Sequence, residues 1–279
     1  MSGDTPEFSV RFWGVRGSIA TADAATLRYG GNTSSLEVRC GARRVLLDAG
    51  TGIRYAGLAM LAEGKPIDAD LLLTHTHLDH IVGLPFFAPF FVPGHRFRLH
   101  AGHLLPDYTI RQAITELMRA PFFPVPPEAF RADIAFCDFR AGETLDISPE
   151  IVIRTVALNH PNGATGYRIE FAGKSICYLT DTEHVIGRPD ESILRLIAGT
   201  DIMIYDATYT DAEFPNHLHW GHSTWQEGAR LANAAGVGTY VVFHHDPGHD
   251  DAMLDDIAAE LRQTRPGSLL AREGLILRP

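Results

Sequence analysis

The sequence predicts an α/β fold in which two β-sheets pack against each other and helices cover their outer faces. Each half of the chain begins with strand-like segments joined by short turns, and this pattern predicts hairpins. Strand and helix patterns then alternate toward the C-terminus. No linker or low-complexity tract interrupts the 279 residues, and a chain of this length can form one core. We therefore expect a single domain over residues 1–279.

The first half contains a strand, a hairpin and a helix before its most informative motif. Residues 7–13 alternate apolar and polar side chains, which predicts a strand with one buried face. Residues 35–39 and 44–47 are expected to form a hairpin, and residues 53–61 a helix. Asp48 lies between the hairpin and the helix. Its carboxylate is therefore expected either to orient a metal-bound histidine from outside the ligand shell or to cap the helix.

Residues 101–133 interrupt the strand pattern. Apolar side chains recur at helical spacing over 107–119, between stretches that are rich in proline and phenylalanine. We expect a partly helical insertion at 101–133, which is either a lid over the site or an ordinary surface excursion. The aromatic residues of this region, with Phe122 as the candidate, are expected to form the wall of a substrate pocket.

The second half repeats the alternation of elements. We expect strands at 151–158, 166–171, 174–179, 202–205 and 240–243, and helices near 190–198, 223–235 and 250–263. Four of these strands run directly into a ligand-type side chain: His160, Asp181, Asp206 and His244. Because strand ends along one edge of two packed sheets converge, these distant positions are expected to form a single site.

Composition indicates an ordinary globular protein, with 45% apolar and 21% charged residues. No apolar run approaches the length of a membrane span, and the polar, acidic start differs from a signal sequence. Three separated cysteines suggest neither a disulfide framework nor a thiolate zinc site, so we expect a reducing, cytoplasmic setting. The formal net charge of −10 opposes nonspecific binding to nucleic acid.

The strongest local signal is a cluster of ligand-type side chains after a buried strand. Residues 71–74 are too short and too apolar for an amphipathic helix, so they predict a strand. Residues 75–80 then read His-Thr-His-Leu-Asp-His. In extended backbone the first two histidines project to the same side, and the Asp-His pair faces a second point nearby. A histidine-rich surface loop is the alternative, but this density of ligands after a buried strand predicts metal binding.

At these positions the chain resembles the metallo-β-lactamase superfamily. The resemblance rests on Asp48-Ala49-Gly50, the His-x-His-x-Asp-His motif at 75–80, Asn159-His160, Thr180-Asp181-Thr182 and Phe243-His244, in this order over nearly the whole chain. It implies an αββα sandwich, with two mixed sheets flanked by helices, around a binuclear centre.

The resemblance also implies a ligand set. The first metal would be held by His75, His77 and His160, the second by Asp79, His80 and His244, and Asp181 would bridge both. A carboxylate can bridge two cations about 3.5–4 Å apart. We expect two divalent ions, with zinc as the first candidate and manganese or iron as alternatives. His245 would then either line the pocket or support a ligand from outside the ligand shell.

Within the superfamily the chain is similar to the phosphodiesterase branch, which includes the tRNA 3′-processing endonucleases. Asp181 occupies the bridging position, where true β-lactamases have cysteine. Gly221-His222-Ser223-Thr224 resembles the His-x-Thr motif of the tRNA-processing enzymes, which implies that His222 contacts the scissile phosphate and helps to protonate the leaving group, with Asp206 orienting it. The alternative is that His222 merely precedes a helix N-cap. The long glycine-rich, basic arm of those enzymes is absent from this sequence, which disfavours a tRNA substrate.

We therefore expect a hydrolase that cleaves a small phosphodiester, such as a cyclic nucleotide, through a metal-bridging hydroxide. The expected catalytic residues are Asp79, Asp206 and His222, and the expected substrate contacts are His222, Asn32, His245 and Phe122, with Arg16 as a further candidate. The alternatives are hydrolysis of a lactone, thioester or amide, RNA 3′ processing, diiron redox chemistry, and a metal-binding regulator without activity. No membrane partner is expected, and a homodimer is the default assembly.

Overall fold

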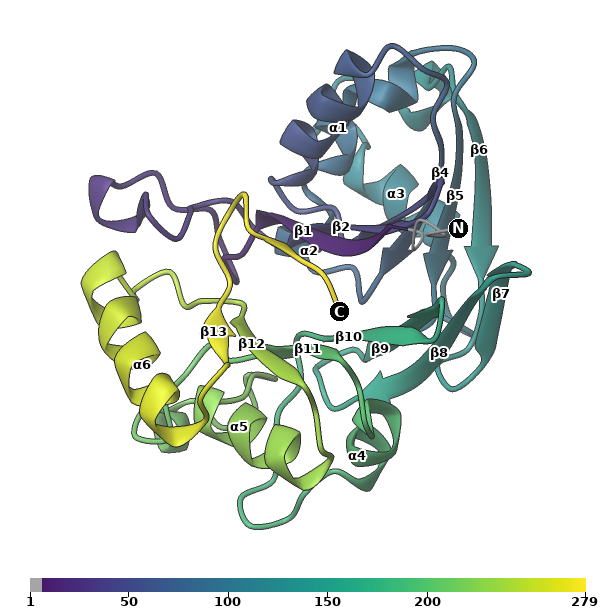
Figure 1. Ribbon diagram of the computed structural model, residues 1–279. Coiled ribbons are helices and arrows are strands. Elements are labelled where there is room, and N and C mark those ends of the chain that lie inside the picture. The colour runs from purple at the N-terminus through teal and green to yellow at the C-terminus, as the bar shows by residue number, and fades with distance from the viewer. Residues whose placement is uncertain (1–6) are drawn as a thin grey trace.

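The computed structural model describes residues 7–279 and contains two seven-stranded mixed sheets that face each other (Figure 1). The sheet orders are β14-β1-β2-β3-β4-β5-β6 and β13-β12-β11-β10-β9-β8-β7. In both sheets one half is antiparallel and the other half is parallel. This arrangement confirms the expected αββα sandwich.

The first sheet is built almost entirely from the first half of the chain. Its strands are β1 (Phe8–Gly14), β2 (Ser35–Cys40), β3 (Arg43–Leu47), β4 (Asp68–Leu73), β5 (Arg96–Ala101), β6 (Asp133–Asp138) and the C-terminal β14 (Ile276–Leu277). Its helices are α1 (Ile53–Ala62), α2 (Leu78–Ile81) and α3 (Ile110–Leu117), with 3-10 turns at η1 (Ala24–Thr26), η2 (Leu84–Phe86), η3 (Ala88–Phe91) and η4 (Pro127–Ala129).

The second sheet mirrors the first. Its strands are β7 (Thr144–Ser148), β8 (Ile151–Leu158), β9 (Ala164–Phe171), β10 (Lys174–Leu179), β11 (Ile202–Asp206), β12 (Thr239–Phe243) and β13 (Leu269–Leu270). The helices α4 (Glu191–Ile197), α5 (Trp225–Ala234) and α6 (Asp251–Thr264) belong to this half, with a 3-10 turn at η5 (Phe214–Asn216). Among residues 7–279, no helix is both long and apolar enough to cross a membrane.

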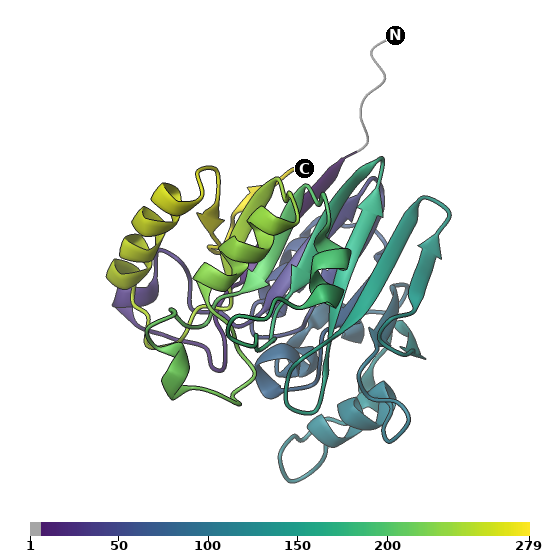
Figure 2. The ribbon, with the colours of Figure 1, turned by 90° about the horizontal axis from the view of Figure 1, so that it is seen from below.

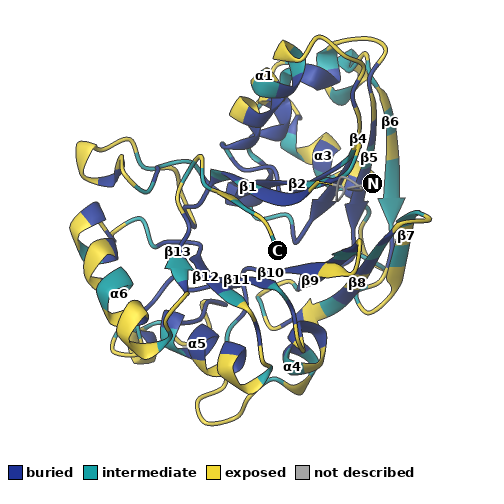
Figure 3. Cartoon of the chain, in the orientation of Figure 1, coloured by how far each residue is buried: buried dark blue, intermediate teal, exposed yellow. Residues whose placement is uncertain are grey.

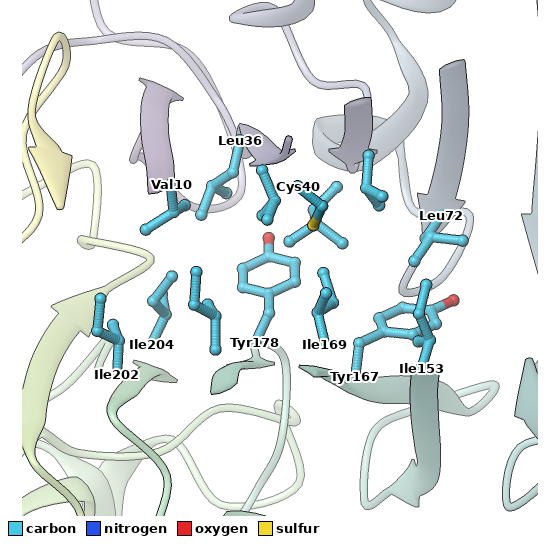
Figure 4. Packing of buried hydrophobic residues seen from close by; sticks show 14 of the residues in the cluster. Val10, Leu36, Cys40, Leu72, Ile153, Tyr167, Ile169, Tyr178, Ile202 and Ile204 are labelled. Carbon is cyan, nitrogen blue, oxygen red and sulfur yellow. The ribbon is translucent and has the colours of Figure 1, made fainter. Parts of the chain in front are cut away.

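Apolar side chains fill three layers, one between the sheets and one between each sheet and its helices. The buried residues lie on the strands and on the inward faces of the helices (Figure 3). In the central layer, Tyr167 and Tyr178 rise from the second sheet toward the first (Figure 4). The Tyr178 hydroxyl donates to Asp48 Oδ2 at 2.8 Å, and the Tyr167 hydroxyl donates to the Leu73 carbonyl at 2.5 Å. Both hydrogen bonds fix one sheet against the other near the ends of β3 and β4.

The segment between β5 and β6 contains α3, as a partly helical stretch should. It joins two parallel neighbours of the first sheet, and its apolar residues Ile110, Ile114 and Met118 are buried in the layer between α1 and that sheet. Its remaining part projects from the end of the sandwich that lies away from the C-terminus (Figure 2). The helix therefore belongs to the crossover connection that a parallel strand pair needs, and only the part outside the helix could act as a lid.

Candidate metal centre

The strands bring their terminal residues together at one edge of the sandwich. Asp48 and His244 directly follow β3 and β12, and Asp181 is the second residue after β10; their φ angles of 57°, 63° and 61° lie in the left-handed region. This conformation costs about 1 kcal/mol or more for a residue with a side chain. Three such residues at one edge indicate that the surrounding packing imposes the turn, and each turn aims a ligand-type side chain into the site.

A first group consists of His75, His77 and His160, whose ring nitrogens lie within 4.8 Å of one another. His160 Nε2 is 3.1 Å from His77 Nδ1. His75 Nε2 is buried and has no hydrogen-bond partner among the described residues. Burial lowers the pKa of all three imidazoles, that of His75 most strongly. The rings are therefore neutral at physiological pH, which is the form that binds metal.

A second group consists of Asp79, His80, Asp181 and His244, all of which are buried. His80 Nε2 and His244 Nε2 are 3.3 Å apart, and each is 3.3 Å from Asp79 Oδ2. The four donor atoms thus surround a common point with two nitrogens and two oxygens, a ligand set typical of zinc and related divalent ions.

Asp181 faces both groups with different oxygens. Its Oδ1 is 3.7 Å from His75 Nε2 and 3.8 Å from His160 Nε2. Its Oδ2 is 3.2 Å from His80 Nε2 and 3.3 Å from His244 Nε2. One carboxylate therefore lies between the two groups in the orientation that a bridging ligand requires.

The outward nitrogens of three of the histidines are held by acceptors. His80 Nδ1 donates to Asp48 Oδ2 at 2.9 Å, His160 Nδ1 donates to the Gly221 carbonyl at 2.8 Å, and His244 Nδ1 donates to Thr208 Oγ1 at 2.9 Å. These bonds leave the inward Nε2 atoms as lone-pair donors. His80 Nε2 and His244 Nε2 face each other at 3.3 Å, and two such lone pairs repel unless a cation lies between them. The residues present therefore fit two divalent ions.

Asp48 contacts His80 of the second group, the contact that one of its two expected roles requires. Besides His80, its carboxylate accepts hydrogen bonds from the Thr74 amide at 2.7 Å and from the Tyr178 hydroxyl at 2.8 Å. Helix α1 instead begins after Gly52, with no side-chain cap. The capping alternative for Asp48 is therefore wrong, and its position favours tuning and orienting His80.

The loop after β1 packs directly on the second group. The Ser18 amide donates to Asp79 Oδ2 at 2.7 Å. A Cβ atom on Gly17 would overlap the imidazole of His244, so only glycine leaves room for this ring. Arg16, which precedes them, is fully buried and donates to the carbonyls of Gly30, Asp246 and His249. The loop is therefore anchored at Arg16 and shapes the site at Gly17 and Ser18.

His222 lies at the side of the cluster, next to both Asp206 and Asp181. Its Nδ1 donates to Asp206 Oδ2 at 3.0 Å and is 3.8 Å from Asp181 Oδ1. Burial opposes the charged form, but the Asp206 carboxylate outweighs it and raises the pKa of His222 to about 9. Thr224 caps α5 two residues later. The segment therefore caps α5 with Thr224 and also brings His222, two residues before the cap, to the cluster.

Three predicted substrate contacts are corrected by the structure. The Asn32 side chain is occupied, because its Nδ2 donates to the Glu273 carboxylate and its Oδ1 accepts from Thr51. His245 is fully buried and its Nε2 donates to the Ala271 carbonyl at 2.8 Å, away from the cluster. Phe122 is 86% exposed and therefore does not wall a pocket. The further candidate Arg16 is likewise unavailable, since its guanidinium is buried against backbone carbonyls.

Sequence reasoning also missed several residues that support the cluster. Thr208 accepts from His244 and donates to Asp206 Oδ1 at 2.9 Å, which links the proposed second metal position to His222. Tyr178 reaches Asp48 from the opposite sheet. His103 contacts Thr76 Oγ1 at 3.2 Å, and burial lowers its pKa to about 4. Only His103 carried a signal, because it belongs to one of the histidine-rich stretches of the chain.

Fold and site together define a metallohydrolase of the αββα class with room for two ions. A sequence profile of the β-lactamase superfamily domain matches residues 43–245. The chain therefore belongs to the metallo-β-lactamase superfamily, and it is a metal-dependent hydrolase.

Individual relatives extend over most of the chain. Ribonuclease Z of Bradyrhizobium diazoefficiens is 25% identical over an alignment 313 residues long, which covers 95% of this chain and 98% of the relative. A diphosphatase of the PhnP family superposes with a TM-score of 0.72 at 21% identity, covering 98% of each chain. Zinc-bound PqqB from Methylobacterium extorquens superposes with a TM-score of 0.71 at 19% identity, covering 97% of this chain and 100% of PqqB. The two structural similarities establish the fold.

Proposed function

We propose that this protein is a binuclear phosphodiesterase that hydrolyses a small phosphodiester, such as a cyclic nucleotide. The observation that carries the proposal is Asp181, whose two oxygens face the two groups of ligands while Oδ1 also lies 3.8 Å from His222. A bridging carboxylate places two cations side by side, and this arrangement suits the attacking and leaving oxygens of a displacement at phosphorus. The similarities to Ribonuclease Z and to a PhnP-family diphosphatase support the same reaction class.

The proposed ligands are His75, His77 and His160 for one ion, Asp79, His80 and His244 for the other, and Asp181 for both. When bound, two divalent ions would make a water molecule acidic near neutral pH and would neutralise charge on the phosphate. We propose zinc as the ion, because mixed imidazole and carboxylate ligands suit it and because PqqB, which has the same fold, was found with zinc. Manganese and iron remain the alternatives.

His222 is proposed to supply the proton for the leaving group. Asp206 accepts from its Nδ1, which fixes the ring and favours the protonated form. The ring lies 3.8 Å from the bridging Asp181 and is only 9% exposed. A proton on its free Nε2 is therefore held beside the position where the scissile phosphate would bind.

Charge favours a small substrate over a long nucleic acid. The segments 74–95, 159–163, 207–224 and 244–250, which follow β4, β8, β11 and β12, contain no lysine or arginine. Binding to a polynucleotide draws most of its affinity from such cations. The full-length similarity to Ribonuclease Z nevertheless supports RNA 3′ processing as the second candidate.

A substrate panel tests the proposal. Metal-loaded protein would be assayed with bis-p-nitrophenyl phosphate, a cyclic nucleotide, a precursor tRNA, a lactone, a thioester and a β-lactam, and metal content would be measured by mass spectrometry. We expect two ions per chain and turnover of the two small phosphodiesters. Cleavage of precursor tRNA alone would favour the second candidate, and turnover only of the lactone or thioester would refute the phosphodiesterase proposal.

Variants then separate metal binding from proton transfer. Asp181→Ala and His77→Ala are expected to abolish activity and to lower metal content. His222→Gln is expected to lower kcat by roughly 10²–10⁴-fold, the usual contribution of a general acid, while both ions are retained. His219→Gln is the matched control, because this histidine is 93% exposed. Loss of metal in His222→Gln would instead make His222 a ligand, which its position beside Asp181, Asp206 and His244 allows geometrically.

A further inference from the structure

Three aromatic rings connect His222 to the protein surface. The Tyr209 ring lies edge-on to His222 with centroids 6.1 Å apart, and His217 stacks on Tyr209 at 4.2 Å and 14°. Trp220 then packs edge-on against His217 at 5.1 Å. We call Tyr209, His217 and Trp220 the aromatic wall. It begins beside His222, the residue proposed to protonate the leaving group, and ends at the Trp220 indole, which is 61% exposed.

The wall is held in place by the chain around it. Tyr209 is buried, and its amide donates to the Ser223 carbonyl at 3.0 Å. His217 Nδ1 donates to the Glu213 carbonyl at 3.0 Å. Trp220 precedes Gly221, whose carbonyl accepts from His160 at 2.8 Å. The exposed indole is therefore positioned one residue away from an atom that holds a proposed metal ligand.

Two further exposed apolar side chains are adjacent in sequence to residues of the site. Leu78 lies between His77 and Asp79 and is 66% exposed, and Ile19 follows Ser18 and is 65% exposed. A single exposed apolar side chain is common on protein surfaces. Here, Ile19, Leu78 and Trp220 come from three different segments of the chain, and each is next in sequence to a residue that contacts the site or belongs to it. The loop that carries the wall, 207–224, contains no lysine or arginine.

We propose that the aromatic wall binds a planar aromatic group of the substrate, the base of a nucleotide, on the leaving-group side of the phosphate. This inference rests on the proposed phosphodiesterase function and narrows its substrate to a mononucleotide-type phosphodiester. Every nucleobase has a π-face that can stack on an indole, so recognition needs no cation. The wall starts beside His222, the residue proposed to protonate the leaving group. The base would therefore lie on the leaving-group side of the phosphate.

Kinetics with matched substrates test the inference. One substrate is a cyclic nucleotide, and the other is the corresponding cyclic phosphodiester of the sugar without its base. We expect Trp220→Ala to raise KM for the nucleotide by roughly tenfold or more, the usual effect of losing one base–aromatic stack, with kcat and metal content unchanged. Trp220→Phe should retain most of the affinity, and the base-free substrate should respond to neither change. Leu218→Ala, 42% exposed in the same loop, is the control.

A binding measurement separates this inference from the proposed function. Metal-loaded wild-type protein and Trp220→Phe would be titrated with a nucleoside monophosphate and with the sugar phosphate alone, and tryptophan fluorescence would be followed. The other tryptophans differ in exposure, and Trp225 is only 3% exposed. Quenching by the nucleotide that is specific to Trp220 supports the wall even if no phosphodiester is hydrolysed. Equal changes in KM for both substrates, or no change in Trp220→Ala, overturn the inference while leaving phosphodiester hydrolysis intact.

Discussion

Replacement of Gly17 by alanine should weaken the binding of the proposed second metal ion without unfolding the protein. An ideal Cβ on Gly17 lies 3.0 Å from His244 Nε2, and closer still to two other atoms of the ring, whereas ordinary contacts begin at 3.4 Å. Because the imidazole is rigid, relieving its closest contacts from 2.4 to 3.4 Å moves the ring by about 1.0 Å, which exceeds the tolerance of about 0.2 Å in metal–ligand distances. The φ angle of Gly17 is not in the left-handed region, so alanine adds no backbone strain.

We expect Gly17→Ala to lower the affinity for the second ion by about 10–100-fold, the usual loss when the residues around a ligand no longer orient it correctly. Isothermal titration with zinc, and metal content after dialysis, would show one tight ion per chain instead of two. Ser18→Ala is the control, because it removes an exposed hydroxyl but keeps the amide that donates to Asp79. Two ions bound to Gly17→Ala with wild-type affinity would show that the ring moves freely, and the reasoning would be wrong.

Two further substitutions test the residue that holds His80 and the contribution of a buried carboxylate in the first sheet to stability. Asp48→Asn should lower the affinity for the second ion by about 10–100-fold, because His80 loses its charged acceptor; zinc titration that shows unchanged affinity would contradict this. For Asp70, burial alone would raise the pKa, but the bonds from His100 and Arg98 lower it to about 2, from an ordinary 3.8. Asp70→Asn should therefore cost about 2 kcal/mol at pH 7. Because the folded-state pKa is depressed, this contribution is present above pH 4 and is lost as the pH falls toward 2. Urea unfolding at pH 7, 5 and 3 measures it, and a constant difference between Asp70→Asn and wild type would refute the assignment.

Strands and helices with a clear period could be predicted from the sequence, whereas one interior strand and the four edge strands could not. The hairpin of β2 and β3 and the helices α1, α5 and α6 lie close to their expected ranges. The interior strand β5 and the edge strands β6, β7, β13 and β14 were missed. In β5 the polar residues Arg98 and His100 are buried or half-buried because both bind Asp70 of β4. Their partner lies 28 and 30 residues away in the chain, so no local pattern shows that these positions belong in a sheet.

In the site, ligands that are adjacent in sequence could be predicted, whereas residues that meet only in the folded chain could not. Residues 75–80 were evident because the ligands are adjacent in sequence. Thr208 and Tyr178 carry no signal, since their roles depend on His244 and Asp48 lying next to them in space. His245 was placed wrongly for a physical reason. Its side chain points away from His244, as alternation along extended backbone requires, and its ring packs against Tyr29 and donates to the Ala271 carbonyl.

Each group of ligands draws on both sheets, and this explains why the packing between the sheets matters for the chemistry. His77 follows β4 of the first sheet and lies 3.1 Å from His160, which follows β8 of the second. His80 and His244 are divided in the same way. The hydrogen bond from Tyr178 to Asp48 crosses the same boundary and continues to His80. A shift of one sheet against the other would therefore disturb both groups together. The buried tyrosines between the sheets consequently act as positioning residues for the metal centre, and the loop at Gly17 performs the same task from the open side.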